Sequence, residues 1–286
     1  LKASRAAAKH YIYEQGTADY TFDEASMKQA DAVEIKIGQG VKPGVGGYLP
    51  AHKVTPEIAE ARGLNAYEAS SAPGRLAGVD SKEDLKKRVS DIRAITDGRP
   101  VGIKIATGRL EEDLAVALGA DPDFITIDCR GGATGAAPTF LKDTVGIPPV
   151  YAILRARKFL DDEGSDVTLC ATGGFRDVAD IAKGLAMGAD AIALSTALLI
   201  AIGCLQSRVC HTGRCPVGIA TQDPALRKMI DIDASAKGLV NFHTGVADEL
   251  SMLARSHGLK DIHRLDVDDL MTTSSEISDH TNIEHV

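Results

Sequence analysis

The stretch Pro100-Val-Gly-Ile-Lys-Ile-Ala106, with the helical pattern at 110–118 and the apolar Phe124-Ile-Thr-Ile-Asp-Cys129 that follow it, decides the fold. Two short strands joined by a helix are typical of parallel pairing, because parallel strands need a crossover connection. The same alternation extends along the chain. Further strands are expected at 31–37, 65–69, 166–171 and 191–195, and helices at 55–61, 82–96, 150–161 and 177–187.

This alternation predicts an α/β fold, a (β/α)8 TIM barrel rather than an open doubly wound sheet, because glycine-rich or polar loops follow nearly every strand. Six strands are expected, and Gly173-Gly174 and Ser195-Thr196 follow the last two. Phosphate-binding barrels hold the anion on the loops after strands 7 and 8. We therefore expect strands 3 to 8 here, with the first two lying before Leu1 or on a partner subunit.

Three cysteines lie within a short segment that has little apolar mass for packing, namely Cys204, Cys210 and Cys215. Clustered thiolates are ligands for iron–sulfur clusters, zinc or Cu(I), so a metal centre is the leading interpretation. Zinc remains open, since His211 completes a Cys₃His set. The expected division is a partial barrel at 1–200, the metal loop at 201–222, and a helical extension at 223–286 that ends in a frayed polar tail from residue 272.

Composition excludes several classes of function. The 286 residues are 44% hydrophobic and 25% charged, and the net charge of −8 disfavours a nucleic-acid binder. No apolar run is long enough for a membrane span. Five cysteines, three of them clustered, do not resemble a secreted disulfide framework, so we expect a cytoplasmic protein.

The phosphate loops suggest a cofactor. Lys104 projects from the strand at 100–106, where a cation stabilises an anionic reduced flavin, so FMN is favoured over other phosphate ligands. The segment from Ser195 to Cys204 is short and mostly helical, about 13 Å at the helical rise. A flavin next to a metal centre predicts an electron relay.

Three motifs resemble a known family. They are the Cys210-x4-Cys215-Pro-Val-Gly-Ile-Ala-Thr-Gln run with Cys204 before it, Leu199-Ile-Ala-Ile-Gly-Cys204, and Glu34-Ile-Lys-Ile-Gly-Gln-Gly-Val-Lys-Pro-Gly-Val-Gly-Gly-Tyr-Leu-Pro50. From about residue 30 to 270 the chain resembles the FMN-binding synthase domain of glutamate synthase, in its archaeal-type or split-subunit form. The resemblance implies a barrel that holds FMN and a [3Fe–4S] cluster. In such a barrel 2-oxoglutarate and ammonia form 2-iminoglutarate, which reduced FMN converts to L-glutamate.

The resemblance also implies roles for individual residues. Lys36 and Lys42 are expected to act in catalysis, and Gln39, Arg62 and Ser81 to contact 2-oxoglutarate. FMN is expected at Lys104, Gly173, Gly174, Ser195 and Thr196, and the cluster at Cys204, Cys210 and Cys215. A dicarboxylate is suited to a bidentate arginine together with a lysine, which agrees with these assignments.

Some segments depart from the family pattern: Tyr48 replaces a polar Gln, Ala72-Pro-Gly-Arg-Leu-Ala-Gly78 replaces Pro-Pro-His-His-Asp, and Arg130-Gly-Gly-Ala-Thr-Gly lacks His-Asp. An N-methylglutamate synthase-like subunit, and a non-catalytic electron-transfer or scaffold subunit, therefore stay open as alternatives. Ammonia or another amine is expected from solution or a glutaminase subunit. The electron donor is ferredoxin, a pyridine-nucleotide reductase subunit or a deazaflavin-linked partner, and we expect an oligomer.

Overall fold

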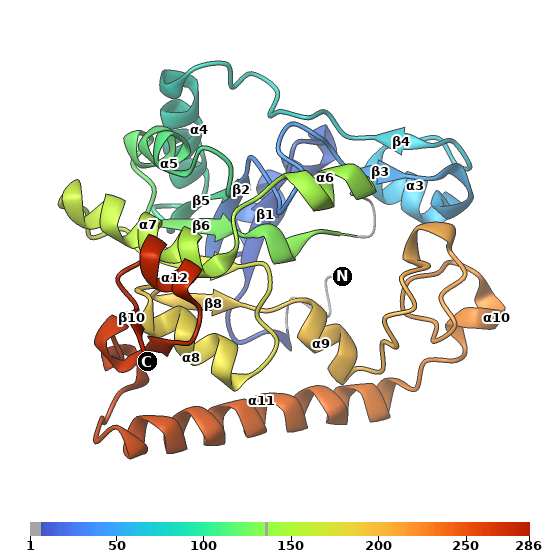
Figure 1. The fold of residues 1–286 in the computed structure, drawn as a ribbon. Coiled ribbons are helices and arrows are strands. Elements are labelled where there is room, and N and C mark those ends of the chain that lie inside the picture. The colour runs from blue at the N-terminus through green and yellow to red at the C-terminus, as the bar shows by residue number, and fades with distance from the viewer. Residues whose placement is uncertain (1–6, 135–136) are drawn as a thin grey trace.

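The computed structural model describes residues 7–134 and 137–286. Its main sheet has six parallel strands in the order of the sequence: β1 (Ile12–Gln15), β2 (Ala32–Lys36), β5 (Val101–Ala106), β6 (Phe124–Asp128), β7 (Thr168–Thr172) and β8 (Ala191–Ala193). Sequential neighbours in one parallel sheet require crossovers of the same hand. The sheet is therefore a six-stranded part of a TIM barrel, as the sequence predicted, with β1 and β8 at its two edges (Figure 1).

Helices cover the outer face of this sheet. They are α4 (Lys82–Ile95), α5 (Leu110–Gly119), α7 (Pro149–Asp162) and α8 (Val178–Ala186), each close to its expected bounds. The central strands send Ile103, Ile125 and Leu169 towards these helices, and all three side chains are fully buried. Burial of about 1.5–3 kcal/mol per large aliphatic side chain makes this layer the main source of stability.

The inner face of the sheet is polar. In register across the strands lie Glu14 opposite Glu34, Lys36 opposite Lys104, and Lys104 opposite Thr126. Because strand side chains alternate between faces, these residues cannot share the apolar layer that contacts the helices. The interior of the barrel thus offers charged groups and hydroxyls.

One strand was missed, and one was predicted where none forms. The expected strands do not include β1, which pairs with β2 near the start of the chain; residues 1–6 lie outside the described part. The strand expected at 65–69 does not form, since Tyr67 has a left-handed backbone (φ 62°) that a ladder excludes. Instead β4 (Ser70–Ser71) pairs antiparallel with β3 (Tyr48–Leu49) outside the barrel. The sequence therefore predicted the right number of strands for the main sheet, six, but placed one of them wrongly.

The connection between β2 and β5 carries α3 (Pro56–Arg62), close to the helix expected at 55–61, and Thr55 caps its first turn. Shorter helices are α2 (Glu24–Met27) and α6 (Thr139–Thr144). After β8 come α9 (Thr196–Ala201), α10 (Pro224–Arg227) and α11 (Ile232–Ser256), which contacts α8 and α9. In the part of the chain that the structure describes, no helix has the length and apolar character to cross a bilayer.

The polar C-terminal segment is ordered, which corrects the expected frayed tail. It forms β9 (Met271–Thr272), α12 (Ser275–His280) and β10 (Glu284–His285), with β10 parallel to β9. Ile283 is 6% exposed and joins the main apolar cluster, and Ile277 packs against the same cluster. These two apolar side chains anchor the segment to the core of the domain, against which it lies folded back (Figure 1).

Candidate active site

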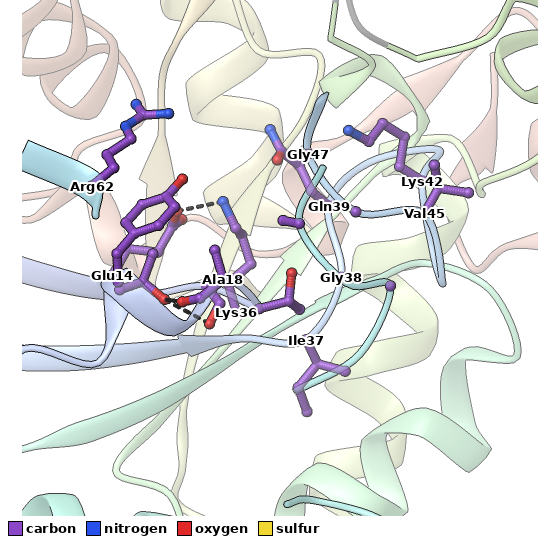
Figure 2. A pocket seen from close by; sticks show the side chains of 17 residues that line it. Glu14, Ala18, Lys36, Ile37, Gly38, Gln39, Lys42, Val45, Gly47 and Arg62 are labelled. Atoms are coloured by element: carbon purple, nitrogen blue, oxygen red, sulfur yellow. Dashed lines mark hydrogen bonds and ion pairs between the residues drawn. The ribbon is translucent and has the colours of Figure 1, made fainter. Parts of the chain in front are cut away.

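A cleft of about 320 Å³ opens at the carboxyl ends of β1 and β2. Four residues predicted from the sequence line it: Lys36, Gln39, Lys42 and Arg62. Figure 2 shows Arg62 and Lys42 at opposite ends of the cleft, with Lys36 and Gln39 between them. The carboxyl ends of the strands are where barrel enzymes carry their active sites, so the cleft is the candidate active site.

One wall of the cleft is formed by closely packed backbone. The loop after β2 contacts the segment at 72–74, where a Cβ on Gly46 would overlap the carbonyl oxygen of Ala72 and one on Gly74 would overlap that of Gly44. Only glycine allows two chains to approach so closely. The glycine-rich loop at 38–47 therefore brings Gln39 and Lys42 to the cleft through backbone packing.

Charge in the cleft is arranged around Glu14. Its carboxylate pairs with the ammonium of Lys36 and lies 3.4 Å from Nζ of Lys104. Lys42 is only 8% exposed, and burial, followed by the charge of Lys36, lowers its pKa. A lysine ammonium with a lowered pKa gives up its proton more readily, which suits a proton donor.

Arg62 is held by an aromatic ring. Its guanidinium carbon lies 5.2 Å from the centroid of Tyr20, and both residues line the cleft. Stacking of this kind fixes a guanidinium and leaves its N–H groups free to bind a carboxylate. Sequence reasoning missed Glu14 and Tyr20 because it did not recognise β1; the alternation Tyr13-Glu14-Gln15 was the available signal.

The expected flavin-binding residues lie elsewhere on the inner face. Lys104 is 15% exposed at its side chain, between Glu14 and Asp128, whose Oδ2 is 3.9 Å from Nζ. The loops with Gly173-Gly174 and Ser195-Thr196 are neighbours, because β7 pairs with β8. The Ser195 side chain does not cap α9, which leaves the first amides of that helix for another acceptor. A phosphate-bearing flavin fits this arrangement, in which Lys104 lies on the inner face of the barrel and the loops after β7 and β8 lie side by side.

Ser81 is not part of this arrangement. Its hydroxyl accepts from the amide of Asp84 at 3.1 Å in a capping box at the start of α4, and it is absent from the cleft lining. The structure gives Ser81 a local structural contact, and its assignment to 2-oxoglutarate binding stays a prediction.

The cysteine loop lies beside the segment that follows the cleft loop, since Lys53 donates to the carbonyl oxygen of Cys210. Burial would raise the pKa of Cys215, but hydrogen bonds from the backbone amides of residues 217–220 outweigh burial and lower that pKa. Among residues 7–134 and 137–286, however, no three His, Cys, Asp or Glu side chains converge as a metal site. The described residues therefore show no preformed set of ligands for an iron–sulfur cluster.

Comparison with known proteins places the chain. The family model for a conserved region in glutamate synthase matches residues 1–260. The chain belongs to the glutamate synthase family. It is 37% identical over 268 residues to an archaeal glutamate synthase [NADPH] from Methanocaldococcus jannaschii, covering 92% of this chain and 52% of that protein. It is 38% identical over 253 residues to an archaeal-type glutamate synthase [NADPH] from Thermotoga maritima, covering 87% and 49%.

A third relative in the glutamate synthase family is a glutamate synthase large subunit-like protein from Rhizobium meliloti. It is 32% identical over 291 residues, covering 95% of this chain and 66% of that protein. The chain spans about half the length of the archaeal-type relatives. Among solved structures, a Pediococcus acidilactici protein described as a lactate oxidase has a TM-score of 0.54 at 18% identity, covering 91% and 60%. A flavocytochrome b2 mutant with pyruvate bound has a TM-score of 0.56 at 14% identity, covering 92% and 55%. These two likenesses confirm the fold.

Proposed function

We propose that this chain is the catalytic module of a glutamate synthase-type oxidoreductase, which reduces 2-iminoglutarate, formed from 2-oxoglutarate and ammonia, to L-glutamate. One observation carries the proposal: Lys36, Gln39, Lys42 and Arg62 line a single cleft at the carboxyl ends of β1 and β2. Membership of the glutamate synthase family supports it. In this proposal residues 1–200 are the flavin-binding part, 201–222 the cysteine loop and 223–286 the extension.

Different cleft residues bind the two ends of the dicarboxylate. The stacked guanidinium of Arg62 binds the distal carboxylate in a bidentate manner, and Lys36 and Gln39 bind at the 2-oxo-acid end. Holding both ends of the substrate fixes the face of its C2 atom that points to the hydride donor. Glu14 keeps Lys36 in place, because the two side chains are paired.

The chemical step needs a hydride for C2 and a proton for the imine nitrogen. Bound FMN, once reduced by the electron donor, would supply the hydride, and Lys104, Gly173, Gly174, Ser195 and Thr196 would hold it. Lys42 supplies the proton, since burial lowers its pKa and it lies in the cleft. Ammonia first replaces the 2-oxo oxygen, which leaves as water, so the two transfers account for all atoms of L-glutamate.

The test of this function is formation of L-glutamate by the purified protein from 2-oxoglutarate and ammonium with chemically reduced FMN. We expect turnover with ammonium, loss of turnover in Lys42→Met, and little product with methylamine. Preferential production of N-methylglutamate would favour an N-methylglutamate synthase-like subunit. Bound cofactor without product from either amine would favour an electron-transfer or scaffold subunit.

The remaining partners follow from this proposal. Electrons arrive from ferredoxin, a pyridine-nucleotide reductase subunit or a deazaflavin-linked protein; the names of the archaeal-type relatives specify NADPH for those proteins. Ammonia comes from solution or from a glutaminase subunit. We place the protein in the cytoplasm, as part of an oligomer.

A [3Fe–4S] cluster on the cysteine loop stays a separate prediction, and no step above depends on it. Protein purified without oxygen is expected to contain iron and acid-labile sulfide, and Cys215→Ser to lose both. Cys129→Ala is the matched control, because that thiol, directly after β6, is fully buried and burial raises its pKa. Zinc in place of iron, or iron retained by Cys215→Ser, would contradict the cluster assignment.

A further inference from the structure

Asp128 is a buried acid at the carboxyl end of β6 for which the proposed chemistry has no role. The residue is 3% exposed, and its Oδ1 has no hydrogen-bond partner among the residues that the structure describes. Buried carboxylates without full hydrogen bonding are uncommon and need an explanation. The surroundings of Asp128 provide one.

Three loops meet over this carboxylate. A Cβ on Gly132, in the loop after β6, would overlap Oδ1 of Asp128, and one on Gly173, after β7, would lie 2.8 Å from the same atom. Gly40, after β2, packs on Gly132 so closely that its Cβ would lie 2.8 Å from the carbonyl carbon. We call Gly40, Gly132 and Gly173 the glycine junction. Its three backbones close around Asp128 because none has a side chain.

The charges around Asp128 come from two neighbouring strands. Burial raises its pKa to about 6, and Lys104 on β5 opposes this shift. The nearby backbone N–H of Gly40 and the charge of Lys36 on β2 also oppose the rise in the pKa of Asp128, while the charge of Glu34 on β2 adds to it. Glu14 on β1 acts indirectly, through its contact with Lys104.

We propose that Asp128 is a positioning residue whose charged carboxylate holds the loop at 38–47, and with it Gln39 and Lys42, in the cleft through the amide of Gly40 and the glycine junction. That the cleft binds 2-oxoglutarate rests on the function proposed above. That Asp128 holds the loop at 38–47 does not rest on it. A charged acceptor binds an N–H about twice as strongly as a neutral one. Protonation of Asp128 therefore loosens the loop and lowers affinity for a cleft ligand.

The sign of the pH effect follows from the raised pKa. The folded state binds the proton of Asp128 more tightly than the unfolded state, so this group favours folding at low pH, and that contribution is lost as pH rises through about 6. The loop responds in the opposite direction, because it needs the charge. The pH dependence of global stability and that of hydrogen-exchange protection in the loop therefore have opposite signs. This difference distinguishes a positioning role of Asp128 from a merely structural one.

Hydrogen–deuterium exchange of peptides covering residues 38–47, corrected for intrinsic rates, tests the proposal without using activity. In the wild-type protein we expect protection to fall about tenfold between pH 7.5 and pH 5, with a midpoint near 6. Asp128→Asn keeps an acceptor of the same shape but cannot titrate, so its protection should not change with pH. Asp128→Ala should be unprotected at every pH.

Glu34→Gln is the matched control, because Glu34 is also a half-buried acid with a raised pKa on the inner face but is bonded to Thr126 rather than to a loop. It should keep the loop transition, moved to lower pH. A wild-type loop whose protection does not change with pH, or the same change in Asp128→Asn, would overturn the proposal. The 2-oxoglutarate affinity of the same proteins is a second readout: a loop transition without any 2-oxoglutarate binding would refute the proposed function and leave the positioning role supported.

Discussion

Replacement of Arg62 by alanine is expected to raise the KM for 2-oxoglutarate about 100-fold, with a much smaller change in kcat. The guanidinium stacks on Tyr20 and faces the cleft, so its loss leaves one substrate carboxylate unpaired. Hydrogen bonds to charged groups contribute about 1.5–3 kcal/mol each, and about 3 kcal/mol corresponds to a 100-fold change. An interaction made equally in the ground and transition states appears in KM alone.

The control for this substitution is Arg88→Ala. Arg88 lies 5.2 Å from the ring centroid of Phe22, the same stacking distance as in the Arg62 pair, but it does not line the cleft. Steady-state kinetics of both variants separate loss of a stacked arginine from loss of a substrate contact. An equal rise in KM for both, or no rise for Arg62→Ala, would show that Arg62 does not bind the substrate. The KM of Arg62→Lys should lie between those of the wild-type protein and Arg62→Ala, because lysine keeps the positive charge but lacks the planar guanidinium that binds a carboxylate through two hydrogen bonds.

Substitution of Gly132 by alanine is expected to lower the melting temperature by several degrees and to abolish 2-oxoglutarate binding. The added methyl group would overlap Oδ1 of Asp128 and lie 3.2 Å from the Cα of Gly173. Overpacking of a tight site typically costs about 1–3 kcal/mol, and in a chain of this size each kcal/mol lowers the melting temperature by about 2–4 °C. Displacement of Asp128 would also release the loop that carries Lys42.

Gly245→Ala is the matched control for a glycine-to-alanine change. Gly245 lies within α11, and a Cβ there would meet nothing within 4 Å. Alanine in a helix interior is favoured over glycine by about 1 kcal/mol, so this variant should be slightly more stable than the wild-type protein. Calorimetry of the two variants gives the comparison; a Gly132→Ala protein as stable as Gly245→Ala would contradict the packing described for the glycine junction.

The helices and central strands of the barrel were predictable because their signals are local. The expected bounds of α4 and α7 agree with the structure to within two residues; α4 begins at the capping box of Ser81 and Asp84, whereas α7 has no side-chain cap. β1 was missed because it is only four residues long and lies next to a helix-like alanine run. The C-terminal segment looked frayed because its order depends on Ile283 reaching the distant core, which composition does not reveal.

The site was predictable where its residues follow strand ends. Lys36, Gln39 and Lys42 come directly at or after the end of β2, so their meeting in one cleft follows from the fold. Arg62 reaches the cleft only because α3 folds back towards Tyr20, a contact between distant segments. The glycine junction has no sequence signal beyond the glycines themselves. Each glycine is required only because the three loops contact one another and Asp128 in the folded protein.

The central claim, that the cleft binds a dicarboxylic 2-oxo acid beside FMN, is tested most directly by titrating the purified flavin-containing protein with 2-oxoglutarate while following the flavin absorption spectrum. The account predicts a saturable spectral change in the wild-type protein, and about 100-fold weaker binding in Arg62→Ala. A protein that holds FMN but shows no spectral response to 2-oxoglutarate, or that responds equally in the wild-type and Arg62→Ala forms, would contradict it.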